Sequence, residues 1–106
     1  MIRFTFENKT YELEFSRQSV RQMESQGFNL EDISSKPMTT IPLLFRGAFY
    51  KNHRGLKTKF IDDLYEKMSD KNGLLNALLE EYSNTLAVLT EDNEEAEGNV
   101  SWEVSR

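Results

Sequence analysis

Hydrophobic and polar residues alternate strictly in two short runs at the start of the chain. Residues 2–6 and residues 11–15 each place an apolar side chain at every second position, which is the period of a half-buried β-strand. Between the runs lie residues 7–10, where Asn8 tolerates the left-handed conformation of a tight turn. We therefore predict a β-hairpin over residues 2–15 with one largely aromatic face. Because an isolated hairpin is marginally stable in water, that face is expected to pack on the helices that follow.

After the hairpin, apolar residues recur with the spacing of amphipathic helices. Ser16 is predicted to cap a first helix, with Val20 and Met23 on its apolar face and Gly27 as its left-handed end. A short helical turn is expected at residues 30–33.

A longer helix is predicted after a break at residues 34–37. Thr39 or Thr40 is expected to cap it, with Pro42 in its first turn, where the missing N–H costs little. Gly55 is expected to end this segment. The apolar positions that follow the i, i+3, i+4, i+7, i+8 pattern are Ile41, Leu44, Phe45, Ala48 and Phe49.

Two further helices complete the predicted body. Thr58 is expected to cap the first of them, and Asn72 with Gly73 is expected to separate it from the second. The first carries Phe60, Ile61, Leu64, Tyr65 and Met68 on one side, and the second carries Leu74, Leu75, Leu78, Leu79, Tyr82, Leu86 and Leu89. The predicted fold class is α+β, with an N-terminal β-hairpin packed on about four α-helices.

Charge divides the chain into a body, residues 1–90, and a tail, residues 91–106. The body holds 12 Lys+Arg and 12 Asp+Glu, whereas the tail holds six acidic residues and one Arg. The formal net charge of −5 therefore arises in the tail. Residues 91–97 are too polar and too like-charged to build a core. We predict one folded domain followed by a flexible acidic tether.

The tail ends in an apolar tip. Val100, Trp102 and Val104 alternate with polar residues, and Trp102 is the single Trp of the chain. This alternation suits addition to an exposed sheet edge, so the three residues are candidates for binding a partner. The alternative interpretation, that Trp102 folds back onto its own body, stays open.

Composition excludes several classes of protein. The chain has no Cys, so it has no disulfides or thiolate metal sites, as fits a reducing cytoplasm. The first residues lack the apolar core of a signal peptide, and no run approaches the ~18 apolar residues of a membrane span. We expect neither secretion nor membrane insertion.

No pattern predicts catalysis, a cofactor or a metal. His53, the single His, lies at an expected helix end, where interaction with the helix dipole is a better explanation than general-base chemistry. Asp62, Asp63 and Glu66 lack the spacing of a cation loop, so a solvated helix face is favoured. The scattered glycines form no phosphate loop. We therefore expect a protein that is not an enzyme and has no catalytic, cofactor-binding or metal-binding residues.

Positive charge concentrates in the segment 46–59, the basic segment of this chain. Its members are Arg46, Lys51, His53, Arg54, Lys57 and Lys59. This segment could contact nucleic-acid phosphates, pair with the acidic tail, or simply be solvated. A neutral body in an acidic chain makes strong nucleic-acid binding the weaker interpretation.

The helices contain more apolar residues than a body of this size readily buries in its core. We expect an exposed remainder that forms an interaction patch and drives homo-oligomer formation. The candidate partner-binding residues on the helices are Phe45, Phe49, Leu78, Leu79 and Tyr82.

Two segments carry a resemblance to a known family. Residues 1–15, MIRFTFENKTYELEF, and residues 98–104, GNVSWEV, resemble the two ends of tail assembly chaperones from long-tailed phages and prophages of Gram-positive bacteria. The intervening helices and acidic linker are similar as well. The resemblance covers most of the chain and includes no catalytic motif.

The resemblance implies a non-enzymatic role in the host bacterial cytoplasm. Members of that family bind and solubilise the tape measure protein, a long hydrophobic helical rod, and help to recruit major tail (tube) protein subunits. They are absent from the finished virion, and many have a longer frameshifted form. Two alternatives stay open: a small regulator that binds nucleic acid through the basic segment, and a minor structural protein of the phage tail or head–tail junction.

Overall fold

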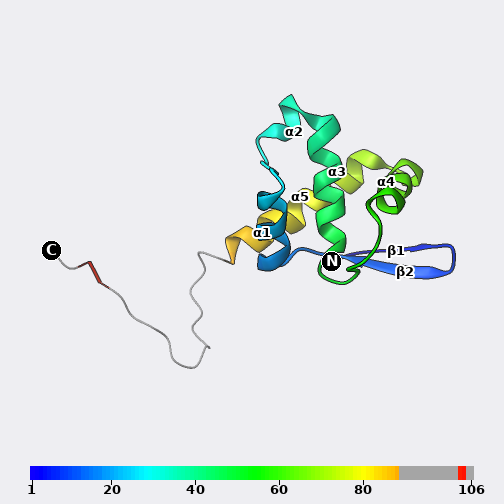
Figure 1. The fold of residues 1–106 in the computed structure, drawn as a ribbon, viewed down its shortest axis with the longest axis horizontal. Helices are drawn as coiled ribbons and strands as arrows, with labels where there is room; N and C mark the ends of the chain where they lie inside the picture. The colour runs from blue at the N-terminus through cyan, green and yellow to red at the C-terminus, as the bar shows by residue number, and fades with distance from the viewer. Residues whose placement is uncertain (89–102, 105–106) are drawn as a thin grey trace, which may run out of the picture.

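A computed structural model describes residues 1–88 and 103–104 of the chain. An antiparallel β-hairpin is followed by five helices, which confirms the predicted α+β fold (Figure 1). The elements are β1 (Ile2–Phe6), β2 (Lys9–Leu13), α1 (Arg17–Ser25), α2 (Asp32–Ser35), α3 (Pro37–Phe49), α4 (Thr58–Lys67) and α5 (Lys71–Ala87). Within these described residues, no helix has the length and apolarity needed to cross a bilayer.

The hairpin forms within the predicted residues 2–15, but β2 begins and ends two residues earlier than the predicted run 11–15. Ile2 pairs with Leu13, and Phe6 pairs with Lys9, so that only two residues make the turn. Both turn residues have positive φ, 50° at Glu7 and 65° at Asn8. A two-residue turn of this handedness matches the twist of the strands, which explains the register.

Helix α3 is the central element of the body. It packs against α1, α2, α4, α5 and β2 (Figure 1). The close approach of α1 depends on Gly47, because a Cβ at this position would collide with the sulfur of Met23. The buried core consists of Tyr11, Leu13, Phe15, Val20, Met23, Phe28, Leu44, Phe45, Ala48, Phe49, Ile61, Leu64, Leu74, Leu78 and Tyr82.

The start of α1 confirms the predicted cap. The Ser16 hydroxyl accepts a hydrogen bond from the Ser19 N–H at 3.2 Å, and the Ser19 hydroxyl accepts one from the Ser16 N–H at 2.8 Å. Both groups would otherwise be unpaired at the helix N-terminus. Gly27 follows the helix with φ of 91°, as expected for a left-handed end.

Two predicted helix starts are wrong. Helix α3 begins at Pro37, before the expected Thr caps, so Pro42 lies inside the helix and has no N–H to donate to the carbonyl of Met38. Helix α4 includes Thr58 as its first residue instead of its cap. Proline at the first helical position explains the early start of α3, since its fixed φ suits a helix there.

The predicted break at Asn72 and Gly73 is also wrong, because both residues lie in the first turn of α5. The break falls at Asp70, which has φ of 48° and whose carboxylate accepts a hydrogen bond from the Gly73 N–H at 3.2 Å. A Cβ at residue 73 would collide with that carboxylate. Gly73 therefore permits the cap instead of breaking the helix.

Candidate interaction surface

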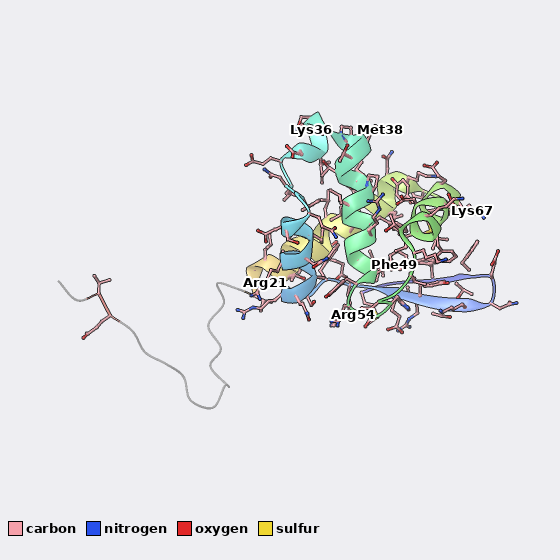
Figure 2. All side chains as sticks on the ribbon, viewed as in Figure 1. Arg21, Lys36, Met38, Phe49, Arg54 and Lys67 are labelled. Carbon is pink, nitrogen blue, oxygen red and sulfur yellow. The ribbon has the colours of Figure 1, made fainter. Side chains whose placement is uncertain are left out.

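Four of the eight predicted partner-binding residues lie in the core. Phe45, Phe49, Leu78 and Tyr82 are 1%, 1%, 0% and 5% exposed. Their helices meet at the centre of the body, and Figure 2 shows Phe49 at the end of α3 that adjoins the hairpin. The expected exposure of these four residues is therefore corrected: packing of α3 and α5 buries them in the single chain.

The fifth helical candidate, Leu79, belongs to a row at the edge of the core. Leu75, Leu79 and Leu86 are all half-buried and pack against the core from α5. At ~100° per residue, the three side chains fall within ~40° of one another around the helix axis. They form an apolar row on one flank of α5, which we call the α5 row.

The apolar tip of the tail is described only in part. Val104 is 66% exposed. Val100 and Trp102 lie outside the described residues, as do the whole of the predicted acidic tether at residues 91–97 and the rest of the tail apart from Glu103. The proposed anchoring role of Trp102 stays a prediction.

His53 has a structural role that differs in detail from the expected helix-dipole contact. Its Nε2 accepts a hydrogen bond from the backbone N–H of Glu12 at 3.0 Å, and its ring centroid lies 5.2 Å from that of Tyr11. An accepting Nε2 requires the neutral tautomer that carries its proton on Nδ1. His53 therefore terminates the outer edge of β2.

The neighbouring Asn52 acts on the same residue of β2. Its Nδ2 donates to the carbonyl oxygen of Glu12 at 3.2 Å and to the Glu14 carboxylate at 3.1 Å. Together with the ammonium of Lys51, 3.2 Å away, this hydrogen bond lowers the pKa of Glu14 below its ordinary range. The loop between α3 and α4 thus supplies to β2 the partners that a third strand would supply.

The outer edge of β1 has no such cover. Glu12 directs its N–H and C=O toward the loop, away from β1, so its register partner Arg3 also directs its backbone groups outward. Thr5, two residues further along the strand, has the same orientation. Among the described residues, none donates to or accepts from these main-chain groups of Arg3 and Thr5. The sequence predicted the hairpin but not which of its edges stays open.

The basic segment is partly neutralised. Arg46 donates two hydrogen bonds to the Asp62 carboxylate, at 2.8 and 2.6 Å, and this contact raises the pKa of the guanidinium. Lys51 pairs with Glu14, as noted above, and Arg54 lies 4.6 Å from the centroid of the Tyr50 ring. Figure 2 shows Arg54 below the end of α3. The ion pairs of Arg46 and Lys51 reduce the positive charge available to phosphates, whereas Arg54 keeps its charge.

The acidic residues of α4 do not converge. Asp62 is engaged by Arg46, and Asp63 is exposed. Within residues 1–88 and 103–104, no three His, Cys, Asp or Glu side chains are placed to share a metal ion.

Two open grooves lie beside α1. One, of about 380 Å³, runs between α1, α3 and the α3–α4 loop and includes Arg46, His53 and Arg54 in its lining. The other, of about 360 Å³, runs between α1 and the end of α5 and is lined by Arg17, Val20, Arg21, Glu24, Thr85 and Leu86. The second groove shares Leu86 with the α5 row, and the rest of its lining is mostly polar or charged.

Comparison with known families gives a match that extends over the full length of the sequence. The family model described as Domain of unknown function (DUF5055) matches residues 1–106. No curated protein and no solved structure matches the chain. Since one family model includes the hairpin, the helical body and the tail, the chain belongs to the DUF5055 family.

Proposed function

We propose that this protein is a non-enzymatic tail assembly chaperone of long-tailed phages or prophages, acting in the host bacterial cytoplasm. The observation that carries the proposal is the resemblance of residues 1–15 and residues 98–104 to the two ends of such chaperones. Its client is the tape measure protein, which it binds and keeps soluble before the tail tube is built. The major tail (tube) protein is its second partner.

The α5 row supports the proposal as a surface for a helical client. Amphipathic helices dock by laying apolar side chains along a partner's hydrophobic groove. Leu75, Leu79 and Leu86 offer such a row, and Leu86 also lines the groove between α1 and α5. Four of the apolar residues first expected to bind a partner are core, so the α5 row takes their place in the proposal.

Charge supports a solubilising role. The tail carries the formal net charge of −5, whereas the body is neutral. A strongly charged segment keeps a protein and its bound client apart from other copies through electrostatic repulsion. A body with an apolar binding surface, followed in the chain by an acidic tail, is therefore suited to a long hydrophobic client.

The test is co-expression of the full chain with the tape measure protein encoded in the same gene cluster. We expect the two to co-purify from lysates that contain no finished particles, and the soluble fraction of the tape measure protein to rise. Failure to co-purify, with no gain in solubility, would overturn the proposal. Presence of the chain in purified particles would instead favour a structural tail protein.

A matched pair of variants tests the surface. Leu79→Gln removes an apolar member of the α5 row, whereas Asn76→Gln changes an exposed neighbour on the same helix. We expect only Leu79→Gln to reduce the amount of co-purified tape measure protein. Circular dichroism of both variants checks that α5 remains folded, and equal retention of the client by both would exclude the α5 row as its site.

A further inference from the structure

We propose that the open edge of β1 binds the C-terminal segment, residues 100–104, of a second copy of this chain. The segment adds to the hairpin as a third, antiparallel strand. The inference is independent of the proposed phage function, since it concerns how two identical chains associate.

The two edges of the hairpin differ at the register pair of Arg3 and Glu12. On β2, His53 and Asn52 already occupy the outward N–H and C=O of Glu12. On β1, the outward main-chain groups of Arg3 and Thr5 have no partner among the described residues. An open edge of this kind is a template for one more strand, because main-chain hydrogen bonds supply the affinity.

The C-terminal segment matches that edge in one register. The side chains of directly opposed residues lie on the same face of an antiparallel pair. Placing Glu103 opposite Arg3 therefore aligns polar with polar and apolar with apolar along the whole segment. The opposed pairs are Ile2 with Val104, Arg3 with Glu103, Phe4 with Trp102, Thr5 with Ser101, and Phe6 with Val100.

Charge selects the antiparallel direction. Arg3 is 63% exposed and already lies 3.4 Å from Glu12 on β2. An antiparallel segment places Glu103 on the other side of Arg3, whereas a parallel segment in which the same five residues align places Ser101 there. Cross-strand pairs of opposite charge stabilise a sheet, so the antiparallel pairing is favoured.

On the apolar face of the hairpin, the added strand would make its largest new contact at Phe4. This ring is half-buried and stacks on Tyr11 with a centroid distance of 5.3 Å. Trp102 in the opposed position would continue the aromatic row across three strands. Trp is the residue type most enriched in interaction hot spots, because it buries a large rigid surface.

We place the segment on a second copy because Val104 and the β1 edge are not in contact within the described part of the single chain. Val104 is 66% exposed in the single chain, and the β1 edge is open in the same structure. Each chain carries one segment and one edge, so reciprocal exchange between two copies satisfies both in a closed dimer.

Amide hydrogen exchange on the full chain tests the pairing. We expect exchange at Arg3 and Thr5 to slow as protein concentration rises from micromolar to millimolar, while Trp102 fluorescence shifts to the blue over the same range. Slow exchange that is independent of concentration would place the segment on its own body and overturn the proposal. Fast exchange at every concentration would overturn it as well.

Substitutions at the paired positions of the tail and of β1 test the register. Trp102→Ala is expected to weaken dimer formation at least ~30-fold, measured by sedimentation equilibrium. Glu103→Arg is expected to weaken it severalfold, and adding Arg3→Glu is expected to restore it. Glu94→Arg, the same charge reversal outside the paired segment, is the control. The register would be overturned if Glu103→Arg and Glu94→Arg weakened the dimer equally, or if adding Arg3→Glu to Glu103→Arg did not restore it.

Discussion

The two strands of the hairpin have the same alternation of apolar and polar residues but different surroundings. On β2, Tyr11 and Leu13 are fully buried, whereas Ile2, Phe4 and Phe6 on β1 are only half-buried. The outer edge of β2 is covered at Glu12 by the α3–α4 loop, and the outer edge of β1 is open at Arg3 and Thr5. One hairpin therefore combines a core strand with a surface strand.

The position of α3 explains the difference. Helix α3 packs against β2, and just beyond β2 the Glu14 N–H donates to the carbonyl oxygen of Ala48 at 3.2 Å. The loop that follows α3 then returns along β2 and contributes Asn52 and His53. Because a helix and its following loop approach from one side, one strand becomes interior and the other stays available for a partner.

The largest expected effect comes from truncating paired residues on the two strands. Leu13 and Ile2 are register partners, but Leu13 is fully buried. Leu13→Ala is expected to lower the free energy of unfolding by about 3 kcal/mol through lost burial and a cavity, and Ile2→Ala by only about 1 kcal/mol. Urea unfolding of both variants measures the difference. Equal losses would show that β1 is as much a part of the core as β2.

Removing the cover of β2 should have a smaller effect. His53→Ala leaves the Glu12 N–H without its acceptor and removes the ring contact with Tyr11. We expect a loss of about 1–2 kcal/mol in unfolding free energy and faster hydrogen exchange at Glu12, approaching that of Arg3. Lys57→Ala, an exposed change in the same loop, is the control. Unchanged exchange at Glu12 would show that the loop does not protect the strand.

The smallest expected effect is a pH dependence at the end of β2. Hydrogen bonding from Asn52 lowers the pKa of Glu14 in the folded protein, so the ionised carboxylate stabilises the fold. This contribution is present above the ordinary carboxyl pKa and is lost as pH falls through the lowered pKa of the folded state. We expect less than about 1 kcal/mol, because the pair is partly solvated.

Unfolding measured from neutral to acidic pH checks this expectation. The stability of Glu14→Gln should fall less steeply with decreasing pH than that of the unchanged protein, and Asn52→Ala should reduce the slope in part. A steeper acid loss in Glu14→Gln would contradict the assigned direction. At β1, the Arg3–Glu12 pair is exposed, and the Glu81 carboxylate pairs with the ammonium of Met1 just before the strand.

Local signals in the sequence determined much of this fold. Alternation predicted both strands, Asn8 predicted the turn, and the Ser16 cap and Gly27 end predicted the limits of α1. Each of these features depends on backbone preferences and on neighbours within a few residues. Helix starts were less accurate, since Pro37 begins α3 where Thr39 or Thr40 was expected.

Tertiary packing decided which apolar residues are surface. Periodicity shows that Phe45 and Phe49 share one face of α3, and that Leu78 and Tyr82 share one face of α5. It does not show how completely neighbouring elements cover those faces. The α5 row emerged only when the positions of the other helices were known. The sequence therefore predicted that all five helical candidates bind a partner, but only Leu79 among them is left at the surface.

Tertiary packing also explains why one edge of the hairpin is covered and the other is open. The sequence by itself determined that two strands pair, because alternation and turn chemistry are local properties. It contained no local signal that His53 would reach Glu12, 41 residues earlier, and close one edge. That contact depends on the path of α3 across the body. Tertiary structure therefore decided which edge is covered and which edge is open to a partner.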